Sequence, residues 1–512
     1  MASSLAGAHQ GREPEPIGGR AVGFDAERFL PDTEAAQLIP RSVAARYLVA
    51  PLSLEGNTLR VAMKDPRNLE TIDYIEMITK MHPVGVAVPE DQLRDLIQRI
   101  YGSSMAGPDV LEATVAEAIR LSKETAEGTE LPIVRLVDQI LAEGVRTGAT
   151  DIHIQPEETE TVVRFRLDGI LGTMTRLPRQ VHVPIATRVK ILSDLDISER
   201  RIPQDGEMQL HLGEKKIDFR VSTLPTVFGE NVVMRLLDHS KVRYGLADLG
   251  YARGDRDKLE LLLKRPNGIL LVTGPTGSGK STTLYAALRM LDSEALNIMT
   301  LEDPVEYQLE GIRQSQIAEK AGFTFASGLR ALMRQDPDVI LVGEMRDQET
   351  TEIALRASLT GHLVLSTLHT TSAIGAVSRL RDMGIQDFLL SATLAGLVAQ
   401  RLVRRVCAEC SEPVEASASE KRYLGIDPEQ KVLLRRGKGC KACGGTGYKG
   451  RFALYELIEM TPELREAISR GASEAEILRT ALAGGLVPMR TQGIDRVLEG
   501  WTTNEELTRV VN

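Results

Sequence analysis

Residues Ile269–Ser281 read Ile-Leu-Leu-Val-Thr-Gly-Pro-Thr-Gly-Ser-Gly-Lys-Ser, an apolar run of strand length that breaks into a glycine-rich turn. Gly274, Gly279, Lys280 and Ser281 fit the pattern G-x-x-x-x-G-K-[ST]. In that pattern backbone N–H groups surround phosphates, the lysine neutralises them and the hydroxyl binds magnesium. The stretch therefore predicts a phosphate-binding loop at the end of a strand.

The sequence after this loop distinguishes a functional motif from a chance glycine turn. Residues 282–291 contain alanine and leucine and predict a helix, whose positive end would face a bound anion. A strand before the loop and a helix after it favour nucleotide binding. We expect a nucleotide and Mg²⁺ as ligands, with Ser281 on the magnesium. The residues expected to bind the nucleotide are Gly274, Pro275, Thr276, Gly277, Ser278, Gly279, Lys280, Ser281 and Thr282.

Length and composition limit the class of protein. A chain of 512 residues has room for about three or four domains. Hydrophobic residues make up 42% and charged residues 26%, as in ordinary globular proteins. No apolar run approaches the roughly 20 residues that span a bilayer, and the N-terminus lacks a signal-peptide core, so we expect a cytoplasmic protein. A net charge of −9 and 4% aromatic residues argue against nucleic acid as the main partner.

The order of patterns along the chain predicts an α/β protein of several parts. Residues 1–22 are rich in Gly, Ser, Ala, Pro and Glu and suggest a disordered leader. Residues 23–101 predict a small α/β unit without clustered catalytic side chains, for which docking is the default role. Residues 102–130 suggest a linker with a charged helix, and residues 131–240 a mixed sheet with helices. Residues 241–512 contain the phosphate loop. A cysteine-containing insert over 401–450 is followed by sequence that predicts helices to the end of the chain.

Strand-like runs at residues 269–273, 297–301, 339–342 and 363–366 alternate with helical segments, which predicts a mainly parallel, helix-covered sheet. Ligands of such sheets bind at the carboxyl ends of the strands. Three of these ends carry candidate catalytic residues. They are Glu302 and Asp303, Glu344, and the pair His362 and His369, which flank one strand.

Each candidate has a specific role and a simpler alternative. Glu344 follows four apolar residues, as expected of an acid that positions magnesium or polarises water. Glu302 and Asp303 would face magnesium, water or an arginine, unless they form only a solvated acidic turn. His362 and His369 would sense the terminal phosphate, unless they are structural.

Phosphoryl transfer also needs positive charge on the transferred oxygens, which another domain or subunit often supplies. The sequence does not choose among several arginines, each of which could equally be a solvated surface charge. The candidates are Arg164, Arg166, Arg179, Arg330 and Arg334.

All four cysteines lie in one region, as two C-x-x-C pairs: Cys407 with Cys410, and Cys440 with Cys443. Residues 411–439 separate the two pairs, and a glycine-rich segment follows the second pair. Four thiolates at this spacing predict a closed, structural zinc site in a reducing compartment. A redox role is the alternative for a single C-x-x-C.

Several motifs resemble the secretion ATPase superfamily. Residues 274–282, 302–306, 334–347 and 361–370 are similar to its Walker A, Asp, Walker B and His boxes. Residues 150–153, 164–169, 201–206 and 220–225 resemble boxes of its second N-terminal domain. The tetracysteine insert resembles the assembly branch, which comprises type II secretion ATPases and type IV pilus extension ATPases.

The resemblance implies an architecture: a small docking domain, a PAS-like second N-terminal domain, and a RecA-like domain with a zinc insert and a helical tail. It implies a homo-hexamer with its nucleotide site between the second and third domains. Lys280 and Ser281 would hold phosphate and magnesium, Glu344 would act in hydrolysis, and Glu302 and Asp303 would arrange water or metal. Arg164 and Arg179 would reach the γ-phosphate, whereas Arg330 and Arg334 would face the interface.

The same resemblance implies partners and a location. Residues 23–101 would bind a cytoplasmic segment of an inner-membrane secretion protein, and the motor would act on an inner-membrane platform protein. The protein would then lie in the cytoplasm, peripheral to the inner membrane. No Arg-Leu-Gly repeat precedes Leu38, so cyclic-di-GMP binding is not expected.

The leading hypothesis is a hexameric ATP-hydrolysing motor of type II secretion, and a type IV pilus extension ATPase is the alternative within the family. A zinc-bearing nucleic-acid translocase is a hypothesis of another class, opposed by the acidic charge balance. A nucleotide-gated docking protein with negligible turnover is a third, opposed by the presence of Lys280 and Glu344.

Overall fold

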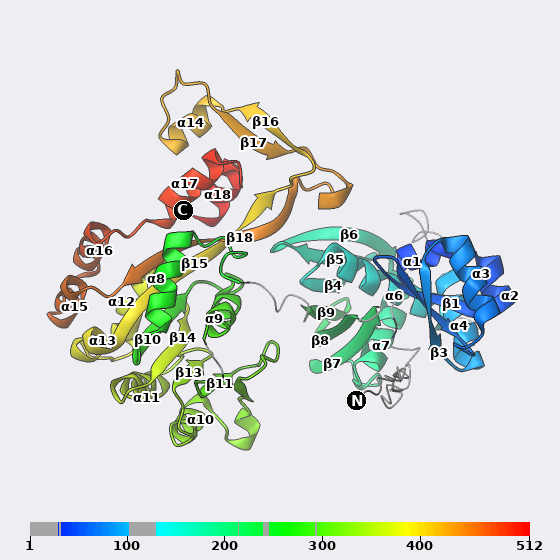
Figure 1. The fold of residues 1–512 in the computed structure, drawn as a ribbon, viewed down its shortest axis with the longest axis horizontal. Coiled ribbons are helices and arrows are strands. Elements are labelled where there is room, and N and C mark those ends of the chain that lie inside the picture. Colours follow the sequence, from blue (N-terminus) through cyan, green and yellow to red (C-terminus); the bar gives the residue numbers. More distant parts are fainter. Residues whose placement is uncertain are drawn as a thin grey trace, which may run out of the picture. The chain divides into compact units, whose positions relative to one another are not determined.

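The computed structural model describes residue 29 and residues 32–101, 130–212, 215–238, 245–291 and 294–511 (Figure 1). The expected leader at 1–22, and nearly all of the expected linker at 102–130, lie outside the described residues. The chain divides into two compact units, and the larger one contains everything from residue 235 onward. The sheets of the chain are described one at a time. None of the described helices is both long enough and apolar enough to span a bilayer.

The N-terminal part is built on a three-stranded sheet in the order β1-β2-β3. Strand β2 pairs antiparallel with β1 and parallel with β3. Of its buried residues, Leu59 belongs to one core cluster with the helix residue Ile75, and Ala62 belongs to another with the helix residue Leu93. The helices and strands confirm the α/β character expected before residue 101, and the domain boundary at that residue stays a prediction. The elements are α1 (Thr33–Leu38), α2 (Arg41–Tyr47), β1 (Val49–Glu55), β2 (Thr58–Met63), α3 (Leu69–Thr79), β3 (His82–Ala87) and α4 (Glu90–Tyr101).

A six-stranded sheet follows, in the order β6-β5-β4-β9-β8-β7. In β8 every second side chain is buried, at Ile217, Phe219, Val221 and Thr223, which is the alternation of a strand with one face on the core. The elements are α6 (Glu130–Thr147), β4 (Asp151–Pro156), β5 (Glu160–Leu167), β6 (Ile170–Pro178), η2 (Arg179–Val181), α7 (His182–Leu192), β7 (Gln204–Leu212), β8 (Lys215–Thr226) and β9 (Gly229–Asp238).

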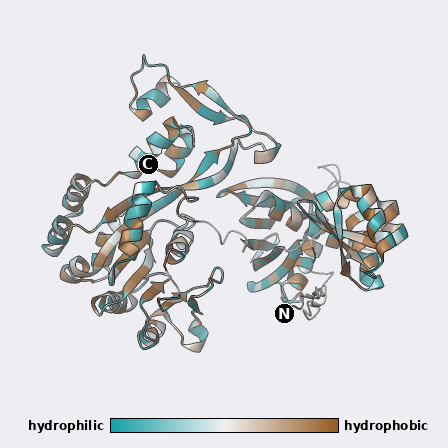
Figure 2. Cartoon of the chain, viewed as in Figure 1, coloured by the Kyte–Doolittle hydropathy of each residue, from teal (hydrophilic) through white to brown (hydrophobic). Residues whose placement is uncertain are grey.

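The third sheet has seven strands in the order β12-β11-β13-β14-β10-β15-β18. All neighbours pair in parallel except β15 and β18, which are antiparallel. Every residue of β10, β13 and β14 is buried, which explains their mainly apolar sequence. Figure 2 shows these strands as mainly hydrophobic, between helices that carry both hydrophobic and hydrophilic residues. The expected parallel, helix-covered sheet is therefore confirmed.

The elements of this sheet and its helices are α8 (Arg253–Leu263), β10 (Gly268–Thr273), α9 (Lys280–Leu288), β11 (Ile298–Glu302), β12 (Arg313–Gln316), η4 (Glu319–Ala321), α10 (Phe325–Leu332), β13 (Val339–Val342), α11 (Gln348–Leu359), β14 (Leu363–Leu368), α12 (Gly375–Asp382), α13 (Asp387–Thr393), β15 (Leu394–Val406) and β18 (Tyr448–Glu459).

The cysteine-containing insert leaves the sheet at the end of β15 and returns at the start of β18 (Figure 1). The sequence predicts only helices after the insert, but the strand β18 comes first and pairs with β15 over most of its length. The insert contains β16 (Ser411–Glu415), α14 (Ala418–Leu424), β17 (Leu433–Gly437) and η5 (Lys441–Cys443). The C-terminal helices are α15 (Pro462–Ser469), α16 (Glu474–Ala483), α17 (Met489–Leu498) and α18 (Asn504–Val510).

Candidate nucleotide site and metal centre

The phosphate loop joins the buried strand β10 to helix α9, as the motif predicts. Gly274 has a φ of 148°, and a Cβ there would lie 2.5 Å from the carbonyl oxygen of Gln400. Gly279 caps α9 with a φ of 87°. Both positions therefore need glycine, because a side chain would strain the turn or collide with β15. The loop thus leads into the N-terminus of α9, and a helix N-terminus after such a loop is where backbone N–H groups bind phosphate groups in proteins.

Lys280 is the first residue of α9, and its ammonium group lies over the loop. It donates hydrogen bonds to the carbonyl oxygens of Gly274, at 2.9 Å, and Pro275, at 3.2 Å. Burial lowers the pKa of Lys280, and the negative charge of Glu344 opposes that fall. A phosphate would be a stronger, charged acceptor for this lysine than two carbonyl oxygens. Ser281 lies exposed on the first turn of α9, as a magnesium ligand requires.

Side chains from β14 fix the backbone that carries Glu344. The hydroxyl of Ser366 donates to the carbonyl oxygen of Val342 at 2.6 Å, and that of Thr367 donates to Gly343 at 2.8 Å. Because β10, β13 and β14 are parallel neighbours, Glu344 and the phosphate loop follow carboxyl ends at the same edge of the sheet. The structure thus brings Glu344 and Lys280 to one site.

The carboxylate of Glu344 is 15% exposed, forms an ion pair with Arg346, and lies 3.4 Å from Nε2 of His369. Arg346 also contacts the carboxylate of Asp303 at 3.5 Å. The bond to Glu344 raises the pKa of Arg346, so this arginine stays charged. Arg346 is a residue that sequence reasoning missed, although it lies two positions after Glu344 in the Walker B box.

Glu302 is placed differently from Asp303. Its side chain is buried and accepts hydrogen bonds from the hydroxyls of Tyr285 and Thr300 and, at 3.1 Å, from the amide of Gln314. Tyr285 belongs to α9, so Glu302 ties the helix of the phosphate loop to β11. Three donors leave this carboxylate engaged inside the protein, whereas Asp303 lies at the site with a 38% exposed side chain.

His362 lies at the amino end of β14, opposite the strand ends that carry the phosphate loop and Glu344. It precedes β14, and its carbonyl oxygen accepts from the N–H of Gly268, where β10 begins. Its Nδ1 lies 2.8 Å from the carbonyl oxygen of Ala357. A strand of six residues separates it from His369, about 20 Å of extended chain. This corrects the expectation that both histidines share one site, because only His369 lies beside Glu344.

Among the described residues, Arg330 and Arg334 contact partners other than the phosphate loop. Arg330 is paired with Glu349 of α11, and Arg334 donates to the carbonyl oxygen of Arg330 at 2.7 Å. Both side chains lie at the exposed end of α10, before β13 begins. Their expected place at a subunit interface stays a prediction.

Arg179 is held locally by backbone carbonyl groups. It donates to Glu157 and, at 2.5 Å, to Phe228, and its guanidinium lies 5.7 Å from the centre of the Phe228 ring. Arg164 lies on β5, and its neighbour on the same face, Arg166, pairs with Asp151 at 3.4 Å. The roles of Arg164 and Arg179 on the γ-phosphate stay predictions.

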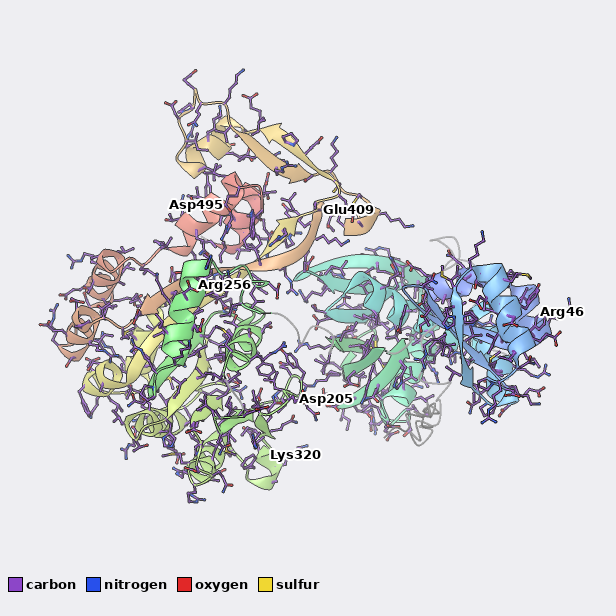
Figure 3. The ribbon with its side chains drawn as sticks, in the orientation of Figure 1. Arg46, Asp205, Arg256, Lys320, Glu409 and Asp495 are labelled. Atoms are coloured by element: carbon purple, nitrogen blue, oxygen red, sulfur yellow. The ribbon has the colours of Figure 1, made fainter. Side chains whose placement is uncertain are left out.

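The four cysteine sulfurs meet in one cluster, within 4.8 Å of one another. Cys407 lies 3.9 Å from Cys440, Cys410 lies 3.9 Å from Cys443, and Cys440 lies 3.7 Å from Cys443. A zinc ion with bonds of about 2.3 Å to four tetrahedral sulfurs requires sulfur separations of about 3.8 Å. Glu409, labelled in Figure 3, lies in the loop between the first two ligands.

The surroundings of the sulfurs suit thiolates. Burial opposes ionisation of Cys443, but N–H groups of Cys440, at 3.1 Å, and Gly447, at 3.3 Å, donate to its sulfur and lower its pKa to about 6. Burial raises the pKa of Cys410 to about 12, and a bound cation would reverse that shift. The donor set therefore fits zinc as a structural metal, with four protein ligands and no open position.

Two family models match most of the chain. The family described as Type II/IV secretion system protein matches residues 126–509, and the MshEN domain matches residues 19–107. The chain is 48% identical to the type II secretion system protein E of Dickeya dadantii (strain 3937), over 93% of this chain and 97% of the relative.

A second relative comes from pilus biogenesis, and a solved structure has the same fold. The chain is 41% identical to the type IV pilus assembly ATPase PilB of Myxococcus xanthus (strain DK1622), over 93% of this chain and 86% of the relative. The Legionella pneumophila ATPase DotB superimposes with a TM-score of 0.54 and 21% identity, over 73% of this chain and 94% of DotB.

Proposed function

The chain belongs to the family of type II/IV secretion system proteins, and from that premise we propose that it is an ATP-hydrolysing motor that powers type II protein secretion. One observation of the site carries the proposal: Lys280 of the phosphate loop and Glu344 at the end of β13 lie at one edge of a parallel sheet. The 48% identity to a type II secretion system protein E, over nearly the full length of both chains, supports type II secretion as the process.

In this proposal the loop residues 274–282 bind ATP, with Lys280 on the phosphates and Ser281 on Mg²⁺. Mg²⁺ neutralises charge on the phosphate oxygens when it is bound. Glu344 orients the attacking water and accepts its proton. Arg346 and His369 hold the carboxylate of Glu344 in place, because both contact it directly.

We further propose that the active site is completed by association. Positive charge from Arg164 and Arg179 would act on the γ-phosphate, and Arg330 and Arg334 would face a neighbouring subunit of a homo-hexamer. An arginine supplied from outside the phosphate-binding domain is a common solution in phosphoryl transfer. The cluster of four cysteines would hold Zn²⁺ and stabilise the insert between β15 and β18.

The proposed partners are membrane proteins. Residues 23–101 would bind a cytoplasmic segment of an inner-membrane secretion protein, and the hexamer would act on an inner-membrane platform protein. The protein would then work at the cytoplasmic face of the inner membrane. The similarity to a type IV pilus assembly ATPase keeps pilus extension as the second candidate.

Deletion of the gene in its own organism separates the two processes. We expect the deletion strain to retain secreted proteins inside the cell and still to assemble pili. A plasmid copy should restore secretion, and a Lys280→Ala copy should not. Loss of pili with normal secretion would contradict the proposal and favour the pilus function.

A further inference from the structure

A buried glutamine supports the phosphate loop from the neighbouring strand. Gln400 lies on β15, which pairs in parallel with β10, and only 1% of the residue is exposed. Its amide nitrogen donates to the carbonyl oxygen of Ser278 at 2.7 Å. Its amide oxygen accepts from the hydroxyl of Thr283 on α9 and from that of Tyr251, both at 2.9 Å. One side chain thus joins the loop, its helix and the segment before α8.

The three contacts define one orientation of the amide. A hydroxyl group can donate to an oxygen, whereas a carbonyl group accepts only. Turning the amide over would place its oxygen against the Ser278 carbonyl oxygen and remove the acceptor from two hydroxyls. Because the group is buried, water would not replace the lost bonds. Gln400 therefore holds the Ser278 carbonyl in a fixed position.

The backbone of the loop lies close to Gln400 at two glycines. A Cβ on Gly279 would lie 3.1 Å from the Gln400 amide nitrogen, and one on Gly274 would lie 2.5 Å from the Gln400 carbonyl oxygen. The backbone of the loop thus packs directly on this residue. A Ser278 carbonyl group held in one position would limit the backbone conformations of the loop that, in the proposed function, binds the phosphates.

Tyr251 fixes Gln400 in turn. It is buried, and its ring stacks on Tyr455 of β18, with centroids 4.1 Å apart and an angle of 13° between the ring planes. The Tyr455 hydroxyl accepts from the N–H of Ala252 at 2.9 Å and donates to Asp255 at 2.8 Å. Tyr251 therefore has a rigid ring position, from which its hydroxyl points at Gln400.

We propose that Gln400 is a positioning residue for nucleotide binding, which holds the phosphate loop through Ser278, and that the hydroxyl of Tyr251 orients Gln400. The inference rests on the proposed function, in which residues 274–282 bind ATP. It predicts that the Tyr251 hydroxyl acts on nucleotide affinity only through Gln400.

Four variants of the full chain test this: Tyr251→Phe, Gln400→Met, the double variant, and the control Tyr448→Phe. The hydroxyl of Tyr448 is also partly buried and forms a hydrogen bond of 2.7 Å with the hydroxyl of Thr503. Its strand partner Val406 lies six residues beyond Gln400, about 20 Å along β15. The affinity for the methylanthraniloyl derivative of ADP is measured with Mg²⁺ by fluorescence titration, together with the melting temperature without nucleotide.

We expect Tyr251→Phe to weaken ADP binding about fivefold, the effect of one hydrogen bond, and Gln400→Met to weaken it about tenfold or more. The double variant should match Gln400→Met within twofold, and Tyr448→Phe should bind like the wild type. Additive losses in the double variant would overturn the proposal.

A lowered melting temperature in Tyr251→Phe with wild-type ADP affinity would also overturn it, because the hydroxyl would then be merely structural. If Gln400→Met does not fold, the ADP affinities of Tyr251→Phe and Tyr448→Phe still test whether the Tyr251 hydroxyl acts on nucleotide binding. A wild-type protein that binds no ADP would instead refute the proposed function, and this inference with it.

Discussion

Replacing Glu344 with glutamine should separate ATP hydrolysis from ATP binding. The change keeps the size of the side chain but removes the charge that pairs with Arg346 and His369. Glutamine is a poor proton acceptor, so the rate at saturating ATP should fall about 10²–10⁴-fold. That range is roughly 3 to 5 kcal/mol of activation free energy. Asp303 is the other carboxylate that contacts Arg346. Its side chain is 38% exposed and is not held at the site by His369, so we expect Asp303 to compensate little for the loss of the Glu344 carboxylate.

The same variant should change the pH dependence of nucleotide binding. The charge of Glu344 supports the pKa of Lys280 against the effect of burial. Without that charge the pKa of Lys280 falls further. Only the protonated lysine neutralises phosphate, so affinity decreases as the pH rises through this pKa. The decrease should begin at a lower pH in Glu344→Gln than in the wild type.

Two assays measure these effects. Phosphate release at saturating ATP gives the rate, and titration with fluorescent ADP between pH 7 and pH 9.5 gives the affinity. Glu260→Gln is a matched control, because Glu260 forms an exposed i,i+4 pair with Lys264 on α8. A Glu344→Gln rate within tenfold of wild type would refute the role of Glu344, and an unchanged pH profile would refute its effect on Lys280.

Three further predictions concern the metal, the C-terminal packing and the phosphate loop. Cys443→Ala should reduce bound zinc well below one ion per chain, measured by elemental analysis, because three sulfurs remain; full zinc content would contradict the four-sulfur site. The carboxylate of Glu506 is buried, which by itself raises its pKa, but bonds from two arginines lower it. Its stabilisation is therefore present above the unfolded pKa near 4.3 and is lost as the pH falls through the lower folded value. Glu506→Gln should lower the free energy of unfolding, measured by urea denaturation, by about 3 kcal/mol at pH 7 and by progressively less as the pH falls through the folded pKa of Glu506; a loss that does not depend on pH would contradict this. Gly274→Ala should weaken ADP binding at least about tenfold, because its Cβ would lie 2.5 Å from the Gln400 carbonyl oxygen, and wild-type affinity in the same titration would contradict the observed packing.

The sequence was most informative where chemistry and periodicity coincide. Continuous apolar runs such as Val339–Val342 predict buried parallel strands, and the structure has a strand with those bounds. The phosphate loop and the two C-x-x-C pairs were predictable, because their residue types and spacing are set by the ligand. The cysteine sulfurs, far apart along the chain, do meet in one cluster.

Side-chain direction was much less predictable. Glu302 and Asp303 are adjacent, yet one carboxylate is buried and bonded inside the protein and the other faces the site. The burial of Glu302 depends on Tyr285 and Gln314, which come from other elements. His362 was assigned to the site although the length of β14 places it at the opposite edge.

Gln400 carried a signal that was not used. It is a polar residue that directly follows the apolar run from Leu394 to Ala399, and a buried polar side chain must find partners. The pattern did not show that those partners belong to the phosphate loop, because β15 becomes a neighbour of β10 only through the order of strands in the sheet.

The most direct test of the central claim is steady-state ATP hydrolysis per subunit over a range of protein concentrations. It compares the wild type with Lys280→Ala and Arg179→Ala. We predict that specific activity rises with concentration, that Lys280→Ala abolishes nucleotide binding, and that Arg179→Ala abolishes hydrolysis while nucleotide still binds. Activity that is independent of both concentration and Arg179 would show that each chain works alone, and would contradict a motor whose site is completed by association.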